Sequence, residues 1–177
     1  RRELARKKYI GKRDWNKSVE YAGRVGAVDF RHAATLEDAQ ALLPHLFRLH
    51  RQRWGGTSKF ENQAYEDLYR ALLFLLWPKG QVAVSAMTLD EKPIAVSFAF
   101  PYKGIWTNHT WVHDRDWGKF SPGTLLVHFM ILDAMDRSYR EFDFTRGAEM
   151  YNERFSNQIR QNTDLVVYGD SREYLQV

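Results

Sequence analysis

The chain has 177 residues and no cysteine. This length suits one domain with a buried core, and the lack of cysteine excludes disulfides, thiolate nucleophiles and cysteine-ligated metals. Its 44% hydrophobic and 15% aromatic residues are typical of a globular protein. No apolar run reaches the roughly 18 residues that cross a membrane, and no signal peptide is visible, so we expect a cytoplasmic protein.

The positive charge is concentrated at the start of the chain. The formal net charge is +4, but residues 1–17 hold eight Lys and Arg against two Asp and Glu, which leaves −2 for the remainder. The pattern predicts a charged helix that either contacts a nucleic acid or an acidic surface, or is a solvated helix following another domain. We expect a basic lead-in over 1–22, preceded by a further half, and one domain over 23–177.

Two helices are predicted after a short strand over 24–33. The first starts at Thr35, which forms an approximate capping box with the acid three residues later, and ends at Gly55. Pro44 inside this helix predicts a kink. The second helix covers 60–77 and is ended by a proline and a glycine.

The second half of the chain alternates with period two before it becomes helical again. Residues 81–89, 94–100 and 105–113 predict three strands joined by short turns, an antiparallel meander. The elements expected after it are a helix over 121–139, a strand over 140–145, a short helix over 148–157 and a strand over 163–169. This order predicts a mixed α+β domain: a mostly antiparallel sheet flanked by helices, with a parallel β-α-β step near its end.

The stretch Ser-Pro-Gly-Thr opens the third long helix. Ser121 suits the N-cap and Pro122 the first helical position. The N–H groups of Gly123, Thr124 and Leu125 then point out of a helix end whose dipole favours an anion. A glycine also lets a phosphate approach the backbone. The residues alone indicate either a phosphate site or a capped helix without a ligand.

A carboxylate stands in the apolar strand "EFDF". The side chain of Asp143 points away from its two phenylalanine neighbours, and such a carboxylate needs a partner. Asp143 therefore either forms a structural pair with Arg146 or, like Glu149, lies near an acceptor group as its orienting group or general base.

Polar and aromatic side chains on the third meander strand and at the end of the first helix are further candidates. His109 and His113 are expected on one face of the strand with Trp111 between them, either as proton acceptors near an acceptor molecule or as a polar strand face. No third ligand follows at metal-site spacing, so no metal is expected. Arg53 and Trp54 either hold an anionic acceptor or complement the helix C-terminus.

These motifs resemble a known family. The segments "LHRQRW" (49–54), "KPIAVSFAF", "SPGTLL" and "FDFTRGAEMYNERF" (142–155), in this order of elements, resemble the GNAT acyltransferase fold. They are more closely similar to its CelD-like branch of cellulose-biosynthesis acetyltransferases, which is related to FemAB-type transferases. Two positions depart from the pattern: Gly123 stands alone where GNAT enzymes have a Gly-x-Gly/Ala loop, and Asn152 replaces a lysine of the branch.

The resemblance implies transfer from acetyl-CoA or another acyl-CoA to a small-molecule or glycan-precursor acceptor. The splayed strands would hold the pantetheine arm, and the acceptor would attack directly, without a covalent enzyme intermediate. Tyr151 is the implied acid for the leaving thiolate, with a packed tyrosine as the alternative. A FemAB-like transferase using aminoacyl-tRNA, or a non-catalytic interaction domain that partners an N-terminal half, are the rival interpretations.

Overall fold

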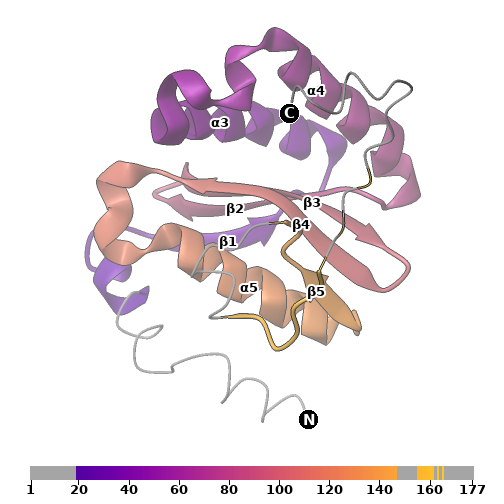
Figure 1. The fold of residues 1–177 in the computed structure, drawn as a ribbon. Helices are drawn as coiled ribbons and strands as arrows, with labels where there is room; N and C mark the ends of the chain where they lie inside the picture. Colours follow the sequence, from indigo (N-terminus) through magenta and orange to yellow (C-terminus); the bar gives the residue numbers. More distant parts are fainter. Residues whose placement is uncertain (1–18, 147–154, 162, 164, 166–177) are drawn as a thin grey trace. The chain divides into compact units, whose positions relative to one another are not determined.

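The computed structural model describes residues 19–146, 155–161, 163 and 165 (Figure 1). The chain divides into two compact units, Arg1–Arg146 and Gly147–Val177. Most of the basic lead-in, and most of the short helix and last strand expected near the end of the chain, lie outside the described residues.

The long elements follow the predicted order. They are β1 (Val28–His32), α3 (Leu36–Trp54), α4 (Gln63–Leu76), β2 (Ala83–Leu89), β3 (Lys92–Tyr102), β4 (Ile105–His113), α5 (Pro122–Asp136) and β5 (Glu141–Asp143). Short 3-10 turns join them, among them η1 (Gly55–Thr57) and η2 (Lys59–Glu61) between α3 and α4, and η4 (Arg115–Phe120) before α5. Of the described helices, none is long and apolar enough to cross a membrane.

Helix α3 starts and stops where its sequence predicts. The hydroxyl of Thr35 accepts the backbone N–H of Asp38 at 3.1 Å, and the Asp38 carboxylate accepts the N–H of Thr35 at 3.2 Å, which completes a capping box. Gly55 ends the helix at a φ of 55°, a conformation that favours glycine. The helix continues through Pro44.

The sheet has the order β1-β2-β3-β4-β5, with four antiparallel strands and a parallel β4–β5 pair. Figure 1 shows α3 and α4 on one face and α5 on the other. The larger core lies under α3 and α4 and includes Phe47, Leu73, Val96, Phe98 and Val112, while the smaller one under α5 is built from Ala99, Trp106 and Ala134. The predicted fold class is therefore confirmed.

Two irregularities of β4 position the candidate site. Phe98 of β3 pairs with Thr110 and the next residue, Ala99, pairs with Asn108, so His109 is an extra residue in β4, a β-bulge. On its other side β4 pairs with β5 over three residues only, Ile105 to Thr107. The β4–β5 pairing therefore ends two residues before His109.

Candidate functional site

The start of α5 differs from its predicted geometry. Ser121 occupies the N-cap position at a φ of 51°, and its side chain makes no capping hydrogen bond to the helix. The N–H of Leu125 donates to the carbonyl of Ser121 at 3.0 Å, so Leu125 is not one of the donors that point out of the helix. Ser121 is thus the N-cap by position but does not cap with its side chain, and the N–H of Leu125 makes the first bond of the helix ladder, as it does at the fourth helical position. Thr124, half-buried, remains a candidate donor.

Packing against His113, as well as a possible ligand, explains why position 123 is a glycine. A Cβ atom added to this buried glycine would lie 2.7 Å from Nδ1 of His113, at the end of β4. The same nitrogen lies 3.3 Å from Nη1 of Arg53. Because a guanidinium only donates, Nδ1 accepts and the His113 proton is on Nε2. Burial, followed by the charge of Arg53, lowers the pKa of His113, which keeps the ring neutral.

This contact gives Arg53 a place that the sequence did not indicate. Arg53 is predicted either to hold an anionic acceptor or to complement the end of α3. Its guanidinium lies beside His113 at the start of α5, 4.7 Å from the centre of the Trp54 ring. A cation at a helix N-terminus adds to the positive dipole of that end. No sequence signal places the end of α3 against the end of β4, because the two are 60 residues apart.

The bulge also separates the two histidines of β4. The ring of His109 is exposed and lies 6.0 Å from that of Tyr69 and 5.4 Å from that of Phe100, on the side of α3 and α4. His113 instead lies against Gly123 of α5. The expectation of a shared face was therefore wrong, since one extra residue reverses the alternation. Trp111 lies 6.1 Å from Phe144, the residue after β5.

A lysine that sequence reasoning missed lies beside the bulge. Nζ of Lys59, in η2, donates to the hydroxyl of Tyr69 at 2.5 Å and to that of Thr110 at 3.0 Å, and the two hydroxyls are 2.7 Å apart. Tyr69 is buried in the core and Thr110 follows His109 directly. Burial lowers the pKa of Lys59 to about 8 and raises that of Tyr69 to about 12.

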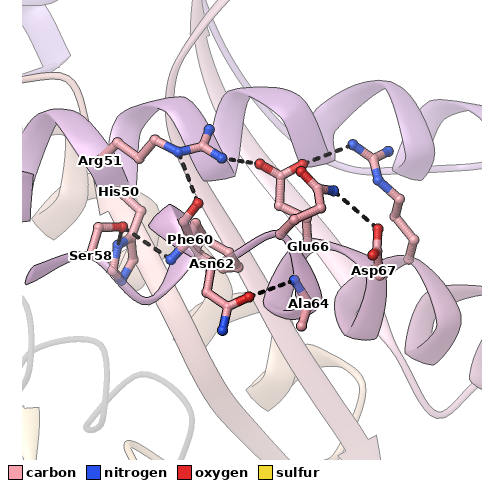
Figure 2. Close-up of polar contacts among 10 residues, drawn as sticks. His50, Arg51, Ser58, Phe60, Asn62, Ala64, Glu66 and Asp67 are labelled. Carbon is pink, nitrogen blue, oxygen red and sulfur yellow. Dashed lines mark hydrogen bonds and ion pairs between the residues drawn. The ribbon is translucent and has the colours of Figure 1, made fainter. Parts of the chain in front are cut away.

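A polar network fixes the segment that carries Lys59 (Figure 2). Nε of Arg51 donates to the carbonyl of Phe60 at 2.9 Å, and its terminal nitrogen binds the carboxylate of Glu66 on α4. The Ser58 hydroxyl accepts the N–H of Phe60 at 3.2 Å and lies 2.7 Å from Nδ1 of His50. These bonds hold both sides of Lys59, so its position is set by α3 and α4.

Lowering the pH from about 7.5 to about 5 is expected to reduce the free energy of unfolding by about 2 kcal/mol through His50. Burial, then the charges of Lys59, Arg53 and Arg51, lower its pKa from 6.5 to about 4. The unfolded chain therefore binds more protons in this window, and stability falls as the pH falls below 6.5. Urea unfolding at several pH values measures this. A His50→Gln variant should show a flatter profile, and an unchanged profile would contradict the assignment.

A serine, a histidine and an aspartate also meet in the core, but they form a structural chain. His32 of β1 lies 2.7 Å from the Ser85 hydroxyl through Nδ1 and 2.9 Å from the Asp133 carboxylate through Nε2. The side chain of Ser85 is fully buried, so it is not a nucleophile for an outside substrate. These hydrogen bonds join β1, β2 and α5 and satisfy polar groups under the helix.

The remaining candidates lie at the end of β5 and beyond it. The carboxylate of Asp143 accepts the backbone N–H of Thr145 at 2.7 Å, and the ion pairs between described residues include none between Asp143 and Arg146. Tyr151 and Glu149 lie outside the described residues. In the part of the chain that is described, no group of three His, Asp or Glu could hold a metal ion.

Comparison with curated proteins found no match. Among solved structures, an aminoglycoside acetyltransferase from an uncultured soil metagenomic sample, in complex with sisomicin, is 11% identical with a TM-score of 0.57, over 81% of this chain and 97% of that one. A ribosomal-protein-alanine N-acetyltransferase from Brucella melitensis is 14% identical with a TM-score of 0.56, over 81% and 99%. The aminoglycoside N-acetyltransferase AAC(6′)-Iy, in complex with CoA, is 12% identical with a TM-score of 0.53, over 82% and 95%.

These structures share the fold of this chain: a mixed sheet flanked by helices, with the parallel β4–β5 pair at its end. The family model of the acetyltransferase (GNAT) domain matches residues 11–153, which is most of the chain and includes β4, α5 and β5. The chain therefore belongs to the GNAT acetyltransferases, enzymes that transfer an acyl group from acetyl-CoA to an acceptor.

Proposed function

We propose that this GNAT domain transfers the acetyl group to an amine or hydroxyl of a small-molecule or glycan-precursor acceptor, as a member of the CelD-like branch. The end of the β4–β5 pairing just before the bulge at His109 carries the proposal. A strand edge that is not occupied by its neighbour offers backbone N–H and C=O groups to an extended ligand arm. Of the segments that resemble the branch, "SPGTLL" opens the helix that follows β4, and Phe142 and Asp143 of "FDFTRG" pair with β4.

The residues around this edge fit acetyl-CoA, which supplies an activated thioester, anionic phosphates and an amide-bearing arm. Arg53 and the first turn of α5, with Thr124, form a positive end suited to phosphates. Nδ2 of the buried Asn108 has no hydrogen-bond partner among the described residues. It lies one residue beyond the last β4–β5 pair. Because an unpaired buried donor is costly, an amide or carbonyl of the arm is a suitable partner for it.

Positioning and polarisation account for the chemistry in this proposal. The bulge leaves His109 without a ladder partner on β3, so a backbone N–H at this position is suited to stabilise the oxyanion that develops on the thioester. Tyr151 donates a proton to the leaving thiolate. Glu149 orients the acceptor or takes its proton. Asp143, whose carboxylate accepts a backbone N–H, acts as a strand-end cap.

Gly123→Ala is expected to destabilise the fold by about 1–3 kcal/mol, because the added Cβ displaces the His113 ring. It is also expected to weaken acetyl-CoA binding, because the Cβ stands in the way of a phosphate that approaches the backbone. Urea unfolding and calorimetric titration measure the two effects. The double variant Gly123→Ala, His113→Ala removes the clash and should regain stability but not affinity. Full recovery of affinity in the double variant would mean that Gly123 serves only the packing of His113.

An acetylation assay tests the proposed acceptor class. Acetyl-CoA is supplied with amino sugars, hydroxyl-bearing oligosaccharides and simple amines, and products are identified by mass spectrometry. Acetylated sugar supports the proposal. Acetyl-CoA binding without any acetylated product from the sugars would contradict the acceptor class. RNA binding that weakens steeply with salt, in the absence of acetyl-CoA binding, would favour the aminoacyl-tRNA alternative.

A further inference from the structure

Lys59 is a partly buried cation whose partners among the described residues are all neutral. Its Nζ donates to the hydroxyls of Tyr69 and Thr110 and lies 5.2 and 4.8 Å from the ring centres of Phe60 and Tyr69. The ion pairs of the described residues include none to this lysine. Hydroxyls and rings stabilise an ammonium, but they do not neutralise its charge.

The charge of Lys59 acts on the residues around it. Burial lowers the pKa of Lys59 to about 8, which means that the ammonium is less stable at this position than it is in water. The same charge helps to lower the pKa values of His50 and His109. The carboxylate of the network that holds this segment, Glu66, binds Arg51 and Arg70. The surroundings of Lys59 are therefore positive, and an anion placed there would be stabilised.

Lys59 lies beside the bulge. Thr110, which binds its ammonium, is the neighbour of His109, and both contact Tyr69. This is the face of the sheet that α3 and α4 cover, opposite α5 (Figure 1). The candidate phosphate-binding end of α5 and the Lys59 ammonium thus lie on opposite sides of β4. A donor held at α5 leaves the Lys59 side to the acceptor.

We propose that Lys59 binds an anionic group of the acceptor, a phosphate or carboxylate, so that the substrates are acidic amines or alcohols such as phosphorylated amino sugars. This inference rests on the proposed function and deepens it. Charge-assisted bonds from an ammonium to such a group are stronger than bonds between neutral groups. Polycationic aminoglycosides, such as the sisomicin bound by the metagenomic acetyltransferase, would be repelled by Lys59.

Binding to the CoA-saturated protein tests the proposal without requiring turnover. Saturation with CoA closes the donor site to phosphate, and the ligands titrated are inorganic phosphate, acetate, glucosamine 6-phosphate and glucosamine. Wild-type protein should bind glucosamine 6-phosphate more tightly than glucosamine. Comparison of the affinities for phosphate and acetate identifies the preferred anion. Lys59→Met keeps the length of the side chain and should weaken binding of the anionic ligands at least about tenfold, with glucosamine unaffected.

The matched control is Lys103→Met, because Lys103 also lies over a tyrosine ring, at 5.3 Å from Tyr102, but is exposed in the β3–β4 turn. It should bind every ligand as the wild type does. Equal anion affinity in the Lys59→Met variant, or no anion binding by the wild type, would overturn the proposal. If the wild-type protein bound the anions through Lys59 but did not bind CoA, the result would count against the proposed acetyl transfer. It would still support an anion-binding site at Lys59.

Steady-state kinetics separates recognition from proton transfer. For an acceptor pair that differs only in a phosphate, Lys59→Met should raise KM for the phosphorylated member and leave kcat close to the wild-type value. An equal fall in kcat for both members would make Lys59 a general base and would overturn its assignment as an anion-binding residue.

Discussion

Tyr151→Phe is expected to lower turnover on the order of 100-fold or more and to leave stability nearly unchanged. The substitution keeps the ring and removes only the hydroxyl, which is the proton donor that the GNAT resemblance implies. A lost general acid acts on the step in which the thiolate leaves, so kcat should fall while acetyl-CoA affinity is preserved. Release of free CoA thiol, followed in the presence of an acceptor, gives the rate.

Tyr102→Phe is the control for this variant, because Tyr102 is an exposed tyrosine at the end of β3. It should retain full activity. A Tyr151→Phe protein with wild-type turnover would remove the tyrosine from the mechanism and leave Glu149 or water as the source of the proton. If Tyr151→Phe lowered stability together with turnover, Tyr151 would instead be a packed residue, the alternative that the sequence left open.

Glu66→Gln is expected to lower the free energy of unfolding by about 2–3 kcal/mol. The Glu66 side chain is 11% exposed and its carboxylate binds both Arg51 and Arg70. Without the negative charge the two guanidinium groups remain close together, and the bond from Arg51 to the Phe60 carbonyl weakens. The value is set below that of a fully buried pair because Arg51 and Arg70 are 37% and 48% exposed.

Asp67→Asn on the same helix is the matched control. The carboxylate of this exposed residue accepts a hydrogen bond from the amide nitrogen of Gln63 at 3.0 Å, and its loss should change stability by less than about 0.5 kcal/mol. Equal melting of the two variants would contradict the structural role of Glu66. Because Arg51 also holds the segment around Lys59, Glu66→Gln should further weaken anion binding at Lys59, whereas Asp67→Asn should not.

The sequence predicted the elements of the fold well because their signals are local. The capping pattern at Thr35, the glycine at position 55 and the alternation of 105–113 each involve residues within a few positions of one another. The parallel β4–β5 pair followed from the order of elements, since a strand, a helix and a strand in one sheet favour it.

The site was less accessible to sequence reasoning because its contacts join distant residues. A bulge at His109 shifts one residue out of alternation, and the strand pattern of "IWTNHTWVH" carries no mark of it. Arg53 meets His113 and Lys59 meets Thr110 across 60 and 51 positions. Gly123 was interpreted through a ligand alone, whereas its missing Cβ also makes room for His113.

Calorimetric titration of the chain with acetyl-CoA tests the central claim most directly. The donor site proposed at β4 and α5 predicts saturable binding at one site per chain, weakened by Gly123→Ala and unaffected by the control substitution Lys103→Met. Competition by CoA should follow, because the phosphates and the arm are common to both molecules. A folded protein, verified by its cooperative unfolding, that gives no saturable binding of acetyl-CoA would contradict the account.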